Sequence, residues 1–356
     1  MTGTDSFASL RHPAIRRWIA VGTTSGLAGT ALNAAVGYQV FAITKNPASL
    51  GLLGAVEAIP SVGLALFGGH FADKADRRKI VLVCQAISVL CALLFAAVSL
   101  LERRPAIGAL YAVVFVAGIA KGFRQPAANA FEARVIPKPL YVNASAWSSS
   151  LWQVAGVLGP AATGIALGSV GFGATYATVA VLHLIALLVT TTLRPTEDVD
   201  VPGDRAKESI FASISEGLRY VWNNKPLLGS MCLDLFAVLF GGAIALLPVF
   251  AEEVLKVGPQ GYGFLQASPA AGALLVMLFA TKRPPIERAG RNLLVVVALF
   301  GVTMIVFALS RSLWLSCLAL FFSGVFDGVS MVIRGAILRL TTPDHLRGRV
   351  SSVSWV

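Results

Sequence analysis

Apolar residues occur along the chain in about ten long runs, and the short segments between them hold nearly all of the charge. A helix needs about 20 residues to cross a hydrocarbon layer of ~30 Å, which is roughly the length of each run. Because the runs are continuous and do not alternate with polar residues, they predict helices and not the strands of a membrane barrel. The expected fold class is therefore an all-α, polytopic membrane protein. The predicted spans are 18–43, 50–72, 79–101, 107–127, 143–168, 171–193, 227–251, 261–281, 293–310 and 313–333.

Composition and charge placement support a membrane protein. With 56% hydrophobic and 13% charged residues, the chain falls outside the range of ordinary soluble domains. Its net charge of +11 would suit nucleic-acid binding, but the cations are sorted by loop. Most lie in the N-terminal tail or after even-numbered spans, which predicts a cytoplasmic N-terminus by the positive-inside rule. We therefore expect a lipid bilayer, and no nucleic acid, as a partner. The cations in the loops after odd-numbered spans are Lys45, Arg103, Arg104, Lys256 and Arg311.

A long polar interval divides the predicted spans into six and four. We expect an N-terminal six-helix bundle at 1–193, a cytoplasmic linker at 194–226 and an incomplete C-terminal bundle at 227–356. Within the linker, apolar residues at helical spacing predict a short amphipathic helix at the membrane interface, with a solvated linker as the alternative. These apolar residues are Ile210, Phe211, Ile214, Leu218 and Val221.

An internal repeat supports this division. At an offset of 206 residues Gly118 matches Gly324, and the last predicted span looks like a second copy of the fourth. By the same offset Val356 corresponds to Ser150, just inside the fifth span. We therefore expect the second half to need two further helices, roughly 45 residues beyond Val356.

The loop after the second predicted span combines a small residue, an aspartate and several cations. A glycine lets two helix ends approach, an aspartate accepts hydrogen bonds at a helix N-terminus, and cations pair with helix C-termini, so the loop can act as a charged latch. It resembles the signature loop of the major facilitator superfamily, although Asp76 stands where that family has a second glycine. The alternative is a loop that is basic only because it faces the cytoplasm. The matching residues are Gly69, Asp73, Lys74, Arg77 and Arg78.

The resemblance covers essentially the whole chain and implies two six-helix halves joined by a cytoplasmic linker. Residues 72–78 and 342–350 are similar to the bacterial branch of that superfamily that includes the enterobactin exporter. This similarity implies a multi-pass protein of the bacterial cytoplasmic (inner) membrane, and we expect a monomer.

A glycine- and proline-containing motif lies in the fifth predicted span. Small residues permit close helix packing, and a proline removes a backbone donor and favours a bend. The motif resembles the antiporter motif of the same superfamily, in which Ala155 and Thr163 would be glycines, and it therefore favours export. The alternative is a purely structural packing seam. The motif residues are Gly156, Gly159, Pro160 and Gly164.

Ionisable residues inside predicted spans are candidates for substrate or proton contact, because an unpaired charge in hydrocarbon is costly. Lys121 and Asp327 occupy the same repeat position, so we consider either an ion pair between them that lines a substrate route or one that holds a gate shut. Glu57 is a candidate proton carrier, with a hydrogen bond to a neighbouring helix as the alternative. By resemblance, the first, fourth, seventh and tenth spans line the central cavity. The candidate residues are Asn33, Tyr38, Gln39, Glu57, Lys121, Arg124, Trp152, Gln153, Asp234 and Asp327.

These features predict a secondary active transporter that exports a small organic molecule, siderophore-like, drug-like or a metabolite, by alternating access and at the expense of a proton gradient. The sequence has no phosphate-binding loop and no cluster of metal-ligating or catalytic residues, so we expect no cofactor, no metal and no enzymatic activity. The alternatives are an importer or facilitator of the same fold, and a membrane receptor or scaffold that binds a ligand without moving it.

Overall fold

A computed structural model describes residues 7–350 apart from residue 75, 102–105, 194–209, 242, 281–288 and 344–349. All regular secondary structure among the described residues is helical, which confirms the predicted all-α fold class. The chain folds into two compact units. The first comprises residues 1–199 and 245–267, and the second comprises residues 200–244 and 268–356. The predicted division into two bundles and a linker stays a prediction.

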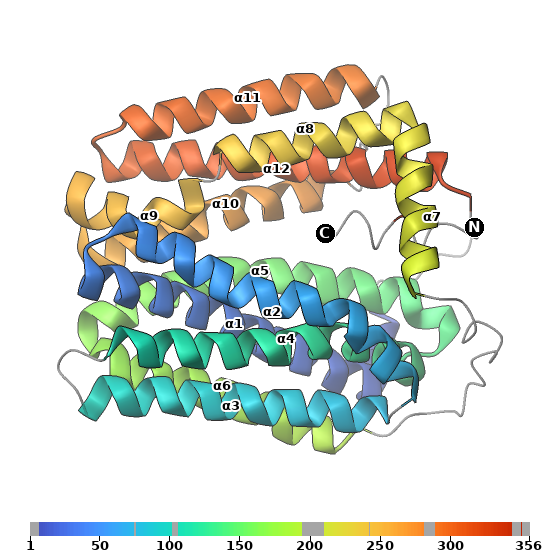
Figure 1. Ribbon diagram of the computed structural model, residues 1–356, viewed down its shortest axis with the longest axis horizontal. Coiled ribbons are helices and arrows are strands. Elements are labelled where there is room, and N and C mark those ends of the chain that lie inside the picture. The colour runs from blue at the N-terminus through green and yellow to red at the C-terminus, as the bar shows by residue number, and fades with distance from the viewer. Residues whose placement is uncertain are drawn as a thin grey trace. The chain divides into compact units, whose positions relative to one another are not determined.

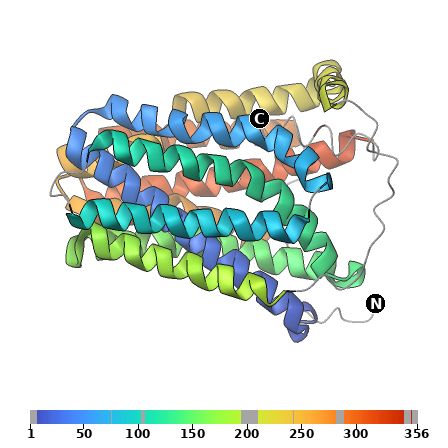
Figure 2. The ribbon, with the colours of Figure 1, turned by 60° about the horizontal axis from the view of Figure 1, so that its bottom comes forward.

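The first unit contains six long helices that run side by side (Figures 1 and 2). Each apolar run among the first six therefore forms one helix, as its length predicts. Their bounds are α1 Pro13–Thr44, α2 Pro47–Lys74, α3 Arg77–Leu101, α4 Ile107–Val135, α5 Tyr141–Ser169 and α6 Gly171–Thr191.

Several of these helices extend beyond the apolar run that predicted them. Helix α4 continues past the predicted end at residue 127 as far as Val135. The added turns bury Phe131 and Val135 in a core cluster with Ile15 and Trp18 of α1. The rings of Trp18 and Phe131 meet edge to face at 5.5 Å, an arrangement that aromatic pairs prefer. The end of α4 is thus set by burial of one helix face. The length of the apolar run in the sequence does not show this burial.

The second unit contains an amphipathic helix and three long helices. Helix α7 covers the segment whose apolar spacing predicted a helix in the linker, and it lies across the end of α8 (Figure 1). Helix α10 begins in the first unit and ends in the second. The bounds are α7 Ile210–Asn223, α8 Lys225–Gly241, α10 Gly258–Ala280, α11 Ala289–Leu309 and α12 Leu313–Thr341.

Among the described residues, nine helices are long and apolar enough to cross a membrane. The predicted span at 227–251 is not among the nine, because the α-helix within it ends at Gly241. Helix α8 ends at Gly241, and it is followed by a 3-10 helix at Ala243–Leu246, the short α9 at Leu247–Val249 and a π-helical turn at Phe250–Val254. Gly241 lacks a side chain and Pro248 lacks a backbone donor, which weakens an α-helical ladder at this point.

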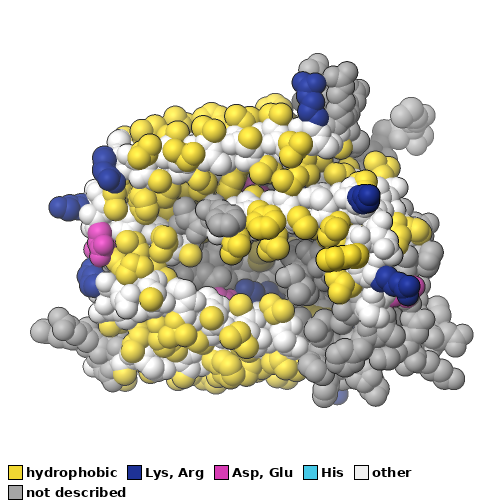
Figure 3. Space-filling view, turned by 45° about the horizontal axis from the view of Figure 1, so that its top comes forward, with side chains coloured by type: hydrophobic (Ala, Val, Ile, Leu, Met, Phe, Trp, Pro, Cys, Tyr) yellow, Lys and Arg dark blue, Asp and Glu magenta, His cyan; other side chains and the backbone are white. Residues whose placement is uncertain are grey.

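The surface of the described helices fits a lipid environment. On the face drawn in Figure 3, hydrophobic side chains cover much of the flanks of the helices, whereas most Lys and Arg side chains lie toward the helix ends. Large exposed apolar side chains such as Ile59, Leu188 and Ile305 are 71%, 56% and 61% exposed. In water such an apolar surface would promote aggregation, whereas in a bilayer it is the ordinary exterior of a spanning helix.

Both glycines of one matched pair in the repeat lie against a neighbouring helix. A Cβ atom built on Gly118 of α4 would lie 2.7 Å from the Glu57 carbonyl oxygen and 2.9 Å from Cγ of Pro60 in α2. A Cβ atom on Gly324 of α12 would likewise contact the carbonyl oxygen of Pro269 in α10. Gly118 and Gly324, which match in the sequence repeat, therefore both lie at close helix contacts. At each contact the missing side chain lets two helix backbones approach.

Candidate functional site

An ion pair lies between two spanning helices of the first unit. Glu57 of α2 and Lys121 of α4 are paired, with 2.9 Å between Oε1 and Nζ. The close approach at Gly118, one turn before Lys121, brings α2 near enough for this contact. The side chains are 29% and 58% exposed, so the pair is only partly enclosed. Each charge has the partner that a charge inside a spanning helix requires.

Helix α4 carries a polar stripe that continues from this pair. Lys121, Gln125 and Asn129 are exposed and follow one another at intervals of one helical turn. The Gln125 side-chain amide donates a hydrogen bond to Oδ1 of Asn129 at 3.2 Å. On the same helix Arg124 is half-buried, and Asn33 of α1 is exposed. Exposed polar side chains that follow one face of a spanning helix are suited to line an aqueous route.

A second cluster of charges lies in the second unit. Arg334 of α12 forms an ion pair with Asp234 of α8, and its Nη2 is also 3.9 Å from Oδ1 of Asp327. The Arg334, Asp234 and Asp327 side chains are 23%, 29% and 46% exposed. Two carboxylates share one guanidinium, so this acid–arginine cluster has a surplus of negative charge. Asp327 is the less closely paired of the two acids.

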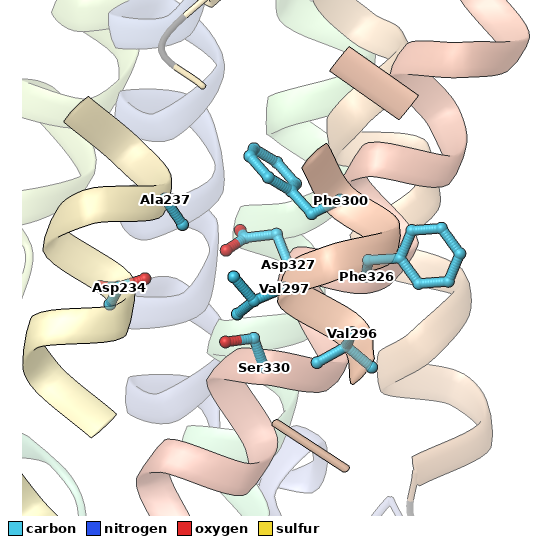
Figure 4. A pocket seen from close by; sticks show the side chains of 8 residues that line it. All are labelled: Asp234, Ala237, Val296, Val297, Phe300, Phe326, Asp327 and Ser330. Atoms are coloured by element: carbon cyan, nitrogen blue, oxygen red, sulfur yellow. The ribbon is translucent and has the colours of Figure 1, made fainter. Parts of the chain in front are cut away.

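A small cavity adjoins the acid–arginine cluster. Its volume of about 20 Å³ is room for roughly one water molecule. Figure 4 shows the side chains of Asp234 and Asp327 directed into the space between α8 and α12. Carboxylates beside a water-sized space are accessible to protons, whereas most of the remaining wall is apolar. The lining residues are Asp234, Ala237, Val296, Val297, Phe300, Phe326, Asp327 and Ser330.

The structure gives each member of the predicted Lys121–Asp327 pair a partner in its own unit. Lys121 contacts Glu57, and Asp327 lies near Arg334. Arg334 was not among the candidates named from the sequence, so its central place between two acids was missed. The spacing of Asp327 and Arg334, seven residues apart on one helix, was the available signal, because such residues share a helix face. The pair between Lys121 and Asp327 stays a prediction.

A third polar cluster lies at the end of α1. The Tyr38 hydroxyl donates a hydrogen bond to Oε1 of Glu252 in the π-helical turn. Lys45 pairs with the other oxygen of the same carboxylate at 3.4 Å. The Tyr262 hydroxyl donates to the carbonyl oxygen of Ala34 at 3.1 Å. Glu252 was not among the sequence candidates. The available signal was that Glu252 and Lys45 both follow odd-numbered predicted spans, which places them on the same side of the membrane. The structure thus gives Tyr38 an acidic partner.

Gln39, another candidate, is part of the packed interior. Its side-chain amide donates to Oγ of Ser99 at 2.9 Å, and its oxygen accepts from the Tyr176 hydroxyl at 2.7 Å. Gln39 is 3% exposed, so it joins α1 to α3 and α6 and does not face an open surface. Trp152 of α5 is 52% exposed and lies against Gly26 of α1, where a Cβ atom would meet its ring at 2.9 Å. Gln153 is half-buried.

The signature loop is described in part. The side chains of Gly69, Asp73 and Lys74 lie outside the described residues. Arg78 donates a hydrogen bond to the carbonyl oxygen of Thr191 at the end of α6, as expected for a cation that caps a helix C-terminus. Asp76 accepts hydrogen bonds from the backbone N–H groups of Arg78 at 3.0 Å and Lys79 at 3.4 Å. The residue that departs from the family motif therefore caps the N-terminus of α3.

The fifth-span motif lies at close helix contacts. A Cβ atom on Gly159 would meet the Thr30 side chain of α1, and one on Gly164 would lie 2.6 Å from the Pro259 carbonyl oxygen of α10. Gly156 is half-buried, and α5 continues through Pro160 as far as Ser169.

The two positions of this motif that depart from glycine join α5 to α1 by hydrogen bonds. The Thr30 hydroxyl donates to the carbonyl oxygen of Ala155 at 3.0 Å. The Thr163 hydroxyl donates to the carbonyl oxygen of Ala31 at 3.4 Å. Small residues and short hydrogen-bonding side chains along one helix seam are the usual means of association between spanning helices.

The helical bundle, its glycine-rich contacts and its paired intramembrane charges are features of a polytopic transporter. The model of the Major Facilitator Superfamily matches residues 19–356, and the chain belongs to this family. It is 25% identical over 359 residues to the enterobactin exporter EntS of Shigella flexneri, covering 96% of this chain and 80% of the relative. It is 24% identical over 352 residues to EntS of Salmonella typhimurium, with 96% and 81% covered.

Solved structures show the same fold. A mutant of the nucleoside transporter NupG matches with a TM-score of 0.72 at 14% identity, covering 96% of this chain and 87% of the other. An inward-facing bacterial homologue of the human lysosomal transporter Spinster matches with a TM-score of 0.69 at 17% identity, with 96% and 78% covered. The protein is thus a multi-pass membrane protein and a secondary transporter for a small-molecule substrate, in a family of transporters and not of enzymes.

Proposed function

We propose that this protein is a proton-driven exporter of a small organic molecule in the bacterial inner membrane, with its N-terminus in the cytoplasm. The observation that carries the proposal is the set of charged side chains held in pairs inside spanning helices. Such charges are costly in hydrocarbon and are retained where they bind substrate or move ions. The names of the relatives support export and make enterobactin the first compound to test.

The acid–arginine cluster is the proposed proton site. Asp234 holds Arg334 closely, which leaves Asp327 as the more exposed carboxylate with the longer contact to the guanidinium. A proton on Asp327 removes the surplus negative charge without leaving a cation unpaired. Loss of that proton restores the charge, so the stability of the cluster differs between the two protonation states. A difference of this kind is what couples proton binding to a conformational equilibrium.

The polar stripe on α4 is the proposed substrate-contacting surface of the first unit. Lys121, Gln125 and Asn129 offer a cation and two amides at turn spacing, with Glu57 as the counterion of Lys121. An acidic group on a substrate competes with Glu57 for Lys121, because both present oxygen atoms to the same ammonium group. In alternating access, Arg78 of the signature loop supports the cytoplasmic side by capping α6, and the α5 motif supplies a close seam against α1.

The test is transport in proteoliposomes that contain the purified protein. With an imposed pH gradient, we expect flux of enterobactin or of another compound from a panel of acidic and aromatic molecules, in the direction opposite to proton movement. Asp327→Asn should abolish gradient-driven flux but retain substrate counterflow, because counterflow needs binding and reorientation without net proton transfer. Glu253→Gln is the matched control, since Glu253 is an exposed acid outside the clusters described above, and it should transport like the wild type.

Three outcomes would overturn parts of the proposal. Flux that follows the proton gradient inward identifies an importer. Compound binding without counterflow identifies a receptor. If the Asp327→Asn variant keeps the gradient-driven flux of the wild type, Asp327 has no role in proton coupling.

A further inference from the structure

An open recess lies where α7 meets α8, in the second unit. Helix α7 ends at Asn223 and α8 begins at Lys225. The recess has a volume of about 550 Å³, far larger than the cavity beside the acid–arginine cluster. Tyr220, Asn223, Asn224, Lys225, Pro226 and Thr341 line it. None of these residues belongs to the proposed transport machinery.

The floor of this recess is fixed by hydrogen bonds and packing. The Tyr220 hydroxyl donates to the carbonyl oxygen of Thr341 at the end of α12. Asn224 donates to the Tyr220 hydroxyl at 3.4 Å and accepts from the backbone N–H of Leu227 at 3.3 Å. Beneath them, Val221 and Leu227 are 4% and 1% exposed in a small apolar core. The recess is therefore held by contacts among three helices.

The rim carries polar groups that remain available. Asn223 and Lys225 are exposed, and within the described part of the chain neither makes a hydrogen bond or an ion pair through its side chain. Arg219, one turn before Asn223 on α7, is exposed as well. The ammonium group of Lys225 and the amide of Asn223 line the recess and are donors, so they suit a ligand that presents several acceptor oxygens and negative charge, such as a phosphate.

Helix α7 also exposes apolar side chains beyond the residues that line the recess. Leu218 and Trp222 lie one turn apart and are 53% and 70% exposed. A tryptophan with this exposure on an amphipathic helix is typical of the membrane–water interface. A ligand that satisfies both surfaces has an anionic head for the recess and a hydrocarbon part for Leu218 and Trp222. A free phosphate ion would leave the apolar surface unused.

We propose that the recess between α7 and α8 binds the head group of an anionic phospholipid, with Lys225 and Asn223 on the phosphate and Leu218 and Trp222 against the acyl chain. This site would attach the linker helix α7 to the bilayer surface. The inference does not depend on the direction of transport or on proton coupling, and its test uses lipid binding alone.

The experiment is native mass spectrometry of the purified protein in detergent with phosphatidylglycerol, with phosphatidylcholine or with inorganic phosphate. We expect bound phosphatidylglycerol in excess of phosphatidylcholine, and no displacement of the bound lipid by millimolar phosphate. Lys225→Gln should weaken phosphatidylglycerol binding about fivefold, which corresponds to the ~1 kcal/mol that one basic residue contributes near an anionic surface. Lys225→Arg should retain the binding.

The chain supplies a matched control. Lys138 is an exposed lysine that begins the same Lys-Pro-Leu sequence ahead of another long helix, α5. Lys138→Gln should leave lipid binding unchanged. A second measurement uses brominated phosphatidylglycerol, which should quench part of the tryptophan fluorescence of the wild type. That part should be absent from Trp222→Phe.

The proposal is overturned if Lys225→Gln and Lys138→Gln lose lipid equally, if the two lipids bind equally well, or if phosphate displaces the lipid. Equal quenching in the wild type and in Trp222→Phe overturns the placement of the acyl chain, and this measurement does not require the Lys225 variants to fold.

Discussion

The substitution Gly118→Ala tests whether the contact between α2 and α4 is as close as the structure indicates. In an open helix position, glycine to alanine stabilises by up to about 1 kcal/mol, because alanine restricts the unfolded chain and favours the helix. At Gly118 the new methyl group would lie 2.7 Å from the Glu57 carbonyl oxygen and 2.9 Å from Cγ of Pro60. Ordinary heavy-atom contacts are about 3.5–4.0 Å, so the helices must separate by roughly 1 Å.

The two obstructing groups determine the size of the effect. A backbone carbonyl and a proline ring cannot rotate out of the way, so the strain must be relieved by moving the helices. Overpacking of this kind costs about 1–3 kcal/mol, which exceeds the gain in helix propensity. Separation of the helices would also lengthen the contact between Glu57 and Lys121, which is 2.9 Å here. We therefore expect Gly118→Ala to be destabilised by about 1–3 kcal/mol.

The assay is thermal unfolding of the purified protein in detergent, followed by tryptophan fluorescence and by the loss of the monodisperse peak in size-exclusion chromatography. Gly108→Ala is the control in the same helix, because a Cβ atom there has no neighbour within 4 Å. Gly118→Ala should unfold several degrees below Gly108→Ala. The reasoning is refuted if Gly118→Ala is as stable as Gly108→Ala or more stable.

The polar clusters give three further predictions, the first and third measured by the same unfolding assay and the second by the yield of folded protein. Arg334→Gln should destabilise the folded protein by about 1–3 kcal/mol, less than for a fully buried ion pair. Adding Asp234→Asn should recover part of this loss, and a double variant without any recovery would contradict the ion pair. Glu57→Lys should reduce the yield of folded protein, and the exchanged pair Glu57→Lys with Lys121→Glu should restore it, whereas failure of the exchange would mean that the contact is not an ion pair. Tyr38→Phe should cost about 1 kcal/mol through the lost hydrogen bond to the π-helical turn, and an unchanged melting temperature would exclude that bond.

Hydropathy and loop charge were sufficient to predict most spanning helices, because burial in lipid acts on whole runs of residues. They did not predict where α4 ends, since Phe131 and Val135 lie in a mixed polar sequence and are buried only by packing in a cluster with residues of other helices. They also did not predict the interruption after Gly241, because the residues on either side of it are as apolar as in a continuous span.

Candidate charges were predictable as a set, but their partners were not. The rarity of ionisable residues in apolar runs identified Glu57, Lys121, Asp234 and Asp327. Pairing depends on distances between helices, and the partners here are separated by 64 residues for Glu57 and Lys121. Arg334 was not among the candidates, whereas the structure joins it to two acids. Helix periodicity within α12 could have placed Asp327 and Arg334 on one face, but no local pattern selects Asp234.

The stretch from Ala243 to Val254 has a consequence for the length of the polypeptide between its neighbours. A 3-10 helix rises about 2.0 Å per residue and an α-helix 1.5 Å, so rewinding Ala243–Leu246 would shorten this stretch by about 2 Å. The N–H group of Leu255 donates to the carbonyl oxygen of Phe250, five residues back, at 2.8 Å. In an α-helix the acceptor is the carbonyl four residues back, so rewinding would move this hydrogen bond by one acceptor. A change of helix type in Ala243–Leu246 would therefore alter the length of the polypeptide at residues 244–245, where the assignment passes from one compact unit to the other.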